Sequence, residues 1–198
     1  MEAQPAWPLV ASMWGAMMVA MMLPSAAPAI LLYARVHRHS HDEGVPPTLA
    51  FLAGYLACWF GFSALAAEVQ LAFASSVSMA LESRAASAAL LIAAGAYQLS
   101  PLKDACLSRC RSPAEFITRY YRPGNWGAFR LGLLHGAYCV GCCWLLMALL
   151  FVGGVMNFAW IAGLTLIVGI EKLVPRGDWI GRAAGLGLIA WGIVRLAS

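Results

Sequence analysis

Charged residues are scarce in this chain of 198 residues: only 11% are Asp, Glu, Lys or Arg, whereas 62% are hydrophobic. Soluble globular domains carry about 25% charged residues. We therefore predict an all-α fold, a polytopic bundle of transmembrane helices that forms a single membrane domain over residues 1–198. The formal net charge of +4 gives no reason to expect nucleic acid as a partner.

Several familiar motifs are also missing. The first ten residues, MEAQPAWPLV, contain one acid and no base. This does not match the positively charged start of a cleaved signal peptide. We find no P-loop, no dinucleotide-binding fingerprint and no readable Ser-His-Asp order, so we predict no catalytic residue and no organic-cofactor site.

Long apolar runs fill most of the chain, which has room for about six spans at about 20 residues each. Pro24 is expected to kink the first span. Residues 103–127 are predicted to form a cytoplasmic loop, and residues 69–82 an interfacial helix or a ragged end of the second span. The predicted spans are residues 9–33, 48–68, 84–102, 128–152, 158–174 and 179–197.

The basic residues are distributed unevenly between the two sides of this arrangement. Arg84 and Arg195 fall on one side, and the rest of the 13 lysines and arginines fall on the other. Because cytoplasmic loops carry the excess of basic residues, both termini are predicted to lie outside. The cytoplasmic set is Arg35, Arg38, Lys103, Arg109, Arg111, Arg119, Arg122, Arg130, Lys172, Arg176 and Arg182.

The most specific motif is the run HGAYCVGCCW at residues 135–144. On a helix, His135, Cys139, Cys142 and Cys143 are spaced i, i+4, i+7 and i+8 and share one face. Three soft sulfurs and an imidazole in an apolar setting suit a soft metal ion, copper or, as the alternative, zinc. Ordinary packing is the other interpretation, since buried cysteine behaves as a small apolar residue.

A methionine block in the first span offers thioether ligands. Met17 and Met21 lie one helical turn apart, and Met21 has about the same estimated depth in the bilayer as Cys139. Thioether and thiolate ligands together select Cu(I). Methionine also fills irregular gaps in cores, so packing alone is a second explanation of the block.

Cys106 and Cys110 form a C-x3-C pair just past the third predicted span. Such a pair can bind a metal from one helical turn, form a disulfide, or remain inert. The predicted cytoplasmic side keeps thiols reduced, which favours a metal-binding role over a disulfide. The two arginines nearby would favour the thiolate form.

Other polar residues lie near the ends of the predicted spans. Glu171 adjoins Lys172, and a local ion pair between them is a simple explanation for an acid in such a position. His37, His39 and His41 alternate in the first predicted loop and could capture a metal ion or belong to a solvated basic segment.

Taken together, four stretches of the chain resemble an uncharacterised bacterial family described as predicted metal-binding integral membrane proteins. The resemblance implies a multi-pass protein of the bacterial inner membrane. It also implies a metal site at the cysteines, His135 and the methionines, and no established activity. The stretches are MMVAMMLPS at residues 17–25, YQLSPLK at 97–103 with Cys106 and Cys110, HGAYCVGCCW at 135–144, and Glu171 with Lys172.

These observations favour a membrane protein that handles copper or another soft metal by transport, buffering or delivery. An accessory subunit of a larger membrane complex, with packed cysteines, is the alternative, and a membrane thiol oxidoreductase is a third interpretation. The expected partners are the lipid bilayer and either other membrane subunits or a protein that accepts the metal.

Overall fold

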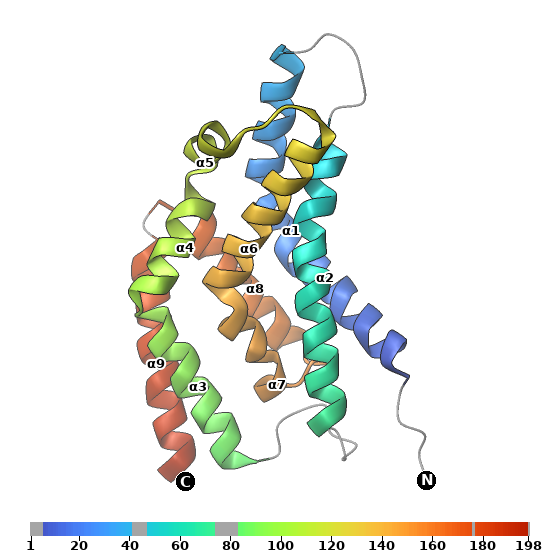
Figure 1. Ribbon diagram of the computed structural model, residues 1–198. Coiled ribbons are helices and arrows are strands. Elements are labelled where there is room, and N and C mark those ends of the chain that lie inside the picture. The colour runs from blue at the N-terminus through green and yellow to red at the C-terminus, as the bar shows by residue number, and fades with distance from the viewer. Residues whose placement is uncertain (1–5, 41–46, 74–82, 176, 198) are drawn as a thin grey trace. The chain divides into compact units, whose positions relative to one another are not determined.

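The computed structural model describes residues 6–40, 47–73, 83–175 and 177–197, and within these ranges it contains helices and no strand (Figure 1). The predicted all-α fold is therefore confirmed. The helices are α1 (Trp7–Ser40), α2 (Thr48–Phe73), α3 (Arg84–Gln98), α4 (Pro101–Arg111), α5 (Pro113–Tyr120), α6 (Gly124–Ala148), α7 (Leu150–Gly153), α8 (Phe158–Leu173) and α9 (Gly177–Ala197).

Four stretches of helix in the described residues are long and apolar enough to cross a membrane: Trp7–Val36, Thr48–Ala72, Gly124–Gly153 and Gly177–Ala197. Helices α3 and α4 make a fifth if they count as one span, although they are bent by 62° at their break. Helix α8 has 16 residues and is thus only about 24 Å long, less than the roughly 30 Å of hydrocarbon core. The predicted number of about six spans is not confirmed.

The helices extend beyond the predicted spans into polar sequence. Helix α1 runs on to Ser40, so the segment from Arg35 is helical rather than a loop. Helix α2 extends to Phe73, and the predicted loop at 103–127 contains most of α4, all of α5 and the start of α6. Residues 74–82, the side chains of His37 and His39, and His41 lie outside the described residues.

Local sequence explains where several helices begin and bend. Ser83 and Asn157 are the N-cap residues of α3 and α8. The side-chain oxygen of Ser83 accepts a hydrogen bond from Ala86 N at 3.3 Å, and that of Asn157 accepts one from Trp160 N at 3.2 Å. Pro101 disfavours helical backbone in the residue before it and suits a first helical turn, so α3 ends and α4 begins there. Helix α1 continues through Pro24 and Pro28, and Figure 1 shows it changing direction along its length.

The chain divides into two compact units, each built from two separate stretches. Unit 1 comprises residues 1–65 and 106–141, and unit 2 comprises residues 66–105 and 142–198. Helices α4 and α6 each begin in one unit and end in the other.

Glycines bring the backbones of α2 and α6 into direct contact within unit 1. A Cβ atom on Gly132 would lie 1.9 Å from the backbone oxygen of Phe51, and one on Gly54 would lie 2.1 Å from that of Phe129. Gly132 and Gly136 form a G-x3-G pair on one face of α6, the spacing that lets membrane helices approach closely. Side chains on α2 can therefore reach the backbone of α6.

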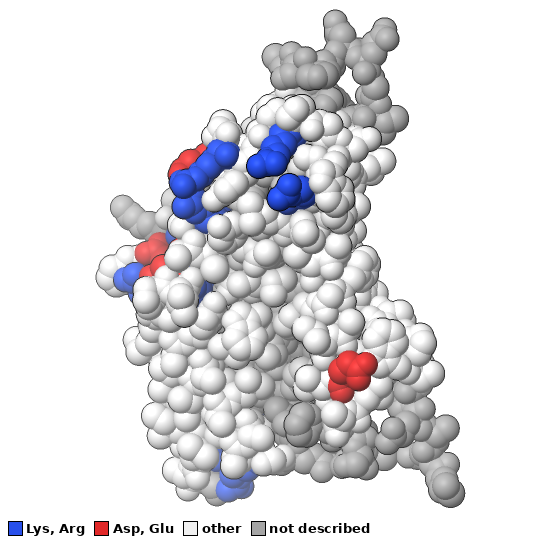
Figure 2. All heavy atoms as spheres, viewed as in Figure 1, with Lys and Arg blue, Asp and Glu red and all other residues white. Residues whose placement is uncertain are grey.

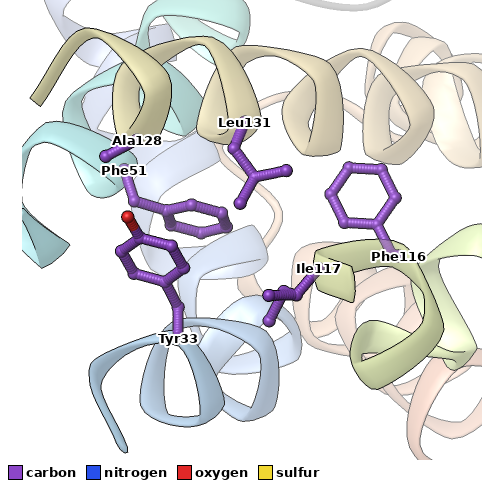
Figure 3. Close-up of a cluster of buried hydrophobic side chains, with 6 residues drawn as sticks. All are labelled: Tyr33, Phe51, Phe116, Ile117, Ala128 and Leu131. Carbon is purple, nitrogen blue, oxygen red and sulfur yellow. The ribbon is translucent and has the colours of Figure 1, made fainter. Parts of the chain in front are cut away.

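A small apolar core lies beside this contact (Figure 3). The rings of Tyr33 and Phe51 stack with their centroids 5.1 Å apart. Helix α5 adds Phe116 and Ile117 to the same cluster. These two side chains form the buried face of this short helix. The cluster consists of Tyr33, Phe51, Phe116, Ile117, Ala128 and Leu131.

Unit 2 contains a buried ion pair between two side chains that are 68 residues apart in sequence. Lys103 Nζ lies 2.6 Å from Glu171 Oε2, and each residue is only 2% exposed. Gln98 completes the group: its amide nitrogen donates to Glu171 Oε1 at 2.6 Å and its amide oxygen accepts from Lys103. The sequence did not identify Lys103 as a partner of Glu171; the bend between α3 and α4 brings the two side chains together.

Glycines of α9 make room for this group. A Cβ atom on Gly181 would lie 2.6 Å from Glu171 Oε1, and one on Gly185 would lie 2.7 Å from the Cβ atom of Gln98. Helix α9 thus presents its glycine face to the charged group, and its larger apolar side chains are exposed, among them Leu186.

Many large apolar side chains are exposed, which is unusual for a soluble protein but suits contact with lipid. Leu65, Phe158 and Trp179 are 68%, 84% and 71% exposed. In the space-filling view, most of the visible surface is uncharged, and Lys, Arg, Asp and Glu form only a few small patches (Figure 2).

Candidate metal site

The four candidate ligands of the HGAYCVGCCW motif lie on one continuous helix, α6, and all are buried. His135, Cys139, Cys142 and Cys143 are each exposed by 3% or less. The boundary between the two units falls after Gly141, so His135 and Cys139 belong to unit 1 and the other two cysteines to unit 2.

The hydroxyl of Tyr55 connects the methionine helix to the cysteine helix. Tyr55 on α2 is completely buried. Its hydroxyl oxygen lies 3.1 Å from the backbone oxygen of Met22 and 3.2 Å from Cys139 Sγ. Met22 O and Cys139 Sγ are therefore no further apart than the sum of these two distances, which is within reach of a methionine side chain.

The ring of His135 sits among aromatic rings. Its centroid lies 5.3 Å from that of Phe116, 5.9 Å from that of Tyr55 and 6.0 Å from that of Phe51. These contacts fix the plane of the imidazole and exclude water from its surroundings. The imidazole is one turn of α6 from Cys139, on the same face.

The methionines of α1 differ in burial. Met18 and Met22 are fully buried and Met21 is 3% exposed, whereas Met17 is half-buried. Ser25 also donates a hydrogen bond to the backbone oxygen of Met22, at 2.9 Å. Most of the methionine block is thus buried, and the backbone of Met22 lies beside Tyr55.

Cys106 approaches the same stretch of α6 from α4. A Cβ atom on Gly141 would lie 3.0 Å from Cys106 Sγ, so this sulfur rests against α6 two residues beyond Cys139. Cys106 and Cys110 are both half-buried, and all six cysteines of the chain are thiols. The disulfide considered for Cys106 and Cys110 is not formed.

Comparison with known protein families links the chain to copper. Residues 11–195 match the family PpoB2, described as copper chaperone. The chain belongs to the PpoB2 copper chaperone family. No curated protein and no solved structure matches it. The family description supports an association with copper, as the sulfur-rich motif suggested, and gives a metal-related role to whatever partner the protein has.

Two residues of this PpoB2 family member were missed by sequence reasoning: Tyr55 and Cys58, which lie three residues apart on the face of α2 that meets α6. The Sγ atom of Cys58 lies 3.2 Å from the backbone oxygen of Leu133, to which it donates. Neither residue has a metal-ligating neighbour in the local sequence. The G-x3-G spacing at Gly132 and Gly136 could have indicated that α6 has a close neighbour.

Within residues 6–40, 47–73, 83–175 and 177–197, no three side chains of His, Cys, Asp or Glu gather in an arrangement that could hold a metal ion. A soft ion has other options, because thioethers also bind Cu(I) and are not among these four residue types.

Proposed function

We propose that this protein is an integral membrane copper chaperone that carries Cu(I) within its helices, with Cys139 as the central ligand. Membership of the copper chaperone family and the long apolar helices support the proposal. The observation that carries it is the Tyr55 hydroxyl, which lies beside both Cys139 and the methionine helix.

The chemistry of the residues favours Cu(I) as the cargo. Cys139 would bind as a thiolate, and the positive ion and the negative sulfur together are neutral, which lowers the cost of burying them. Methionine thioethers and the imidazole of His135 are neutral ligands and add no charge. The Tyr55 hydroxyl donates its single proton to the backbone oxygen of Met22. Once the thiol has lost its proton, the hydroxyl can turn this proton to the thiolate, while Met22 O keeps its bond from Ser25.

The remaining candidate ligands extend this site along the helices. Cys142 and Cys143 continue the face of α6, and Met17 and Met21 offer thioethers from α1. Cys106 and Cys110 are half-buried on α4, and we assign them to the exchange of copper with a partner that accepts it. Thiols exchange a soft ion by forming one bond to sulfur as another breaks.

We further propose six spans in the bacterial inner membrane, with both termini outside and the basic segments in the cytoplasm. Four or five of these spans are supported by helix length and composition, and α8 would be the short sixth. The distribution of basic residues supports the orientation. A variant with Cys110 as its single cysteine should resist an impermeant maleimide added to intact cells, and labelling from outside would reverse the orientation.

Copper titration of the purified protein tests the function. We expect the Cys139→Ser/Cys142→Ser variant to lose Cu(I) binding in competition with a Cu(I) chelator, because hydroxyls are poor ligands for this ion. Met156→Leu is the control, because Met156 is 62% exposed and lies outside the site. Unchanged copper stoichiometry in the double variant would rule out the proposed site. Wild-type protein that binds no copper would favour the accessory-subunit alternative.

A further inference from the structure

Cys58 lies where α2 packs closely against α6, directly opposite a glycine. A Cβ atom on Gly136 would lie 2.9 Å from Cys58 Cβ and 3.2 Å from Cys58 Sγ. Any other residue at Gly136 would push this cysteine away. The thiol also donates to the backbone oxygen of Leu133, one turn earlier on α6, so its position against α6 is fixed by two contacts.

The same two helices bring Cys58 close to Cys139. On α2, Cys58 follows Tyr55 by one turn, and the Tyr55 hydroxyl contacts Cys139 Sγ at 3.2 Å. On α6, Cys139 follows Gly136 by one turn. Cys58 Sγ therefore lies beside α6 about one helical turn before Cys139. Both belong to unit 1.

We propose that Cys58 and Cys139 bind one Cu(I) ion together, as a two-thiolate site between α2 and α6. The inference deepens the proposed copper function and rests on it. Two Cu–S bonds form and two S–H bonds break, so each copper ion that binds releases two protons to solvent. The oxidation state of copper does not change.

The surroundings of the two sulfurs suit such a site. The complex carries one negative charge, which is costly in an apolar interior. The Tyr55 hydroxyl can donate to the Cys139 thiolate and offsets part of this cost. Cys58 is half-buried whereas Cys139 is 2% exposed, so Cys58 would be the thiol that meets incoming copper and Cys139 the one that retains it.

The number of protons released distinguishes this site from one that uses Cys139 alone. At pH values below the pKa of both thiols, a two-thiolate site strengthens Cu(I) binding about 100-fold per pH unit, and a one-thiolate site about 10-fold. We expect the Cu(I) affinity of wild-type protein to show the steeper dependence on pH in competition titrations at pH 6 and 7. The Cys58→Ser variant should show the shallower one and lose one sulfur ligand per copper in X-ray absorption spectra.

Ser63→Ala is a matched control on the same helix, because its hydroxyl bonds only within α2, to Trp59 O at 2.8 Å, and it should keep the wild-type dependence. If the Cys58→Ser variant also keeps the wild-type pH dependence of Cu(I) affinity, the inference is wrong while the copper function stands. Wild-type protein without Cu(I) binding would overturn both.

A second measurement needs no variant. Cu(I) bound to wild-type protein should protect Cys58 from alkylation by a maleimide, read by mass spectrometry of the cysteine peptides. Equal alkylation of Cys58 with and without bound copper would also overturn the inference.

Discussion

Replacing Lys103 by methionine should destabilise the protein strongly, because it would leave Glu171 buried without its cation. Lys103 and Glu171 lie 2.6 Å apart and are each 2% exposed. Removing one partner of such a buried pair costs about 3–5 kcal/mol, because the remaining charge stays out of water. Gln98 would still donate to Glu171, which places the expected loss toward the lower end of that range.

A second substitution tests whether the charge is the cause. Glu171→Gln keeps the shape of the side chain and its hydrogen bonding with Gln98 while removing the charge. We expect Lys103→Met/Glu171→Gln to recover most of the stability lost in Lys103→Met, since two neutral residues leave no uncompensated charge. The free energy of unfolding, measured for each variant in mild detergent, gives the interaction energy of the pair.

An exposed ion pair between α4 and α9, formed by the residue after Lys103, provides the control. Asp104 lies 3.6 Å from Arg182, and their side chains are 47% and 53% exposed. Solvent screens such a pair, so Asp104→Asn should cost less than about 1 kcal/mol. A Lys103→Met variant no less stable than Asp104→Asn would refute the expectation that loss of Lys103 leaves a costly unpaired charge on Glu171.

Three further predictions concern unit 1. Gly54→Ala should lower the free energy of unfolding by about 1–3 kcal/mol, because the new Cβ would lie 2.1 Å from a backbone oxygen of α6. Gly61→Ala is the control, because a Cβ atom there meets nothing within 4 Å, and equal thermal stabilities of the two variants in detergent would contradict the prediction. Tyr55→Phe should weaken Cu(I) binding about tenfold through the lost hydrogen bond to the Cys139 sulfur, and wild-type affinity in a competition titration would argue against that role. Met17→Leu/Met21→Leu should cost under about 1.5 kcal/mol per site and weaken binding of Cu(I) but not of Zn(II), and unchanged Cu(I) affinity would leave the methionines as packing residues.

The parts of the fold that depend on composition could be predicted from the sequence. Apolar runs of span length, such as those in α2 and α6, leave few alternatives to a helix, because every buried backbone group must find its partner within the segment. The boundaries were less predictable. Helix α1 continues to Ser40, since helix formation tolerates polar residues and hydropathy does not mark where a helix ends.

Contacts between distant residues could not be predicted in the same way. Lys103 pairs with Glu171, which lies 68 residues further along the chain. No pattern in the local sequence indicates so distant a partner. Cys58 was overlooked for the same reason, because a single cysteine in an apolar run gives no indication of what it faces. The motif at residues 135–144 could be found because its spacing is local, and its burial on α6 agrees with that pattern.

The two units alternate along the chain, and this has a consequence for biosynthesis. Unit 1 needs residues 106–141 to meet residues 1–65, and unit 2 needs residues 142–198 to meet residues 66–105. At roughly 5–20 residues per second, the ribosome takes several seconds to produce the 40-residue stretch between the two parts of unit 1. During that time α2 has no α6 against which to place Gly54 and Cys58. The face of α2 that carries Gly54 and Cys58 therefore stays without its partner helix, and is open to contacts with wrong helices, until α6 has been synthesised.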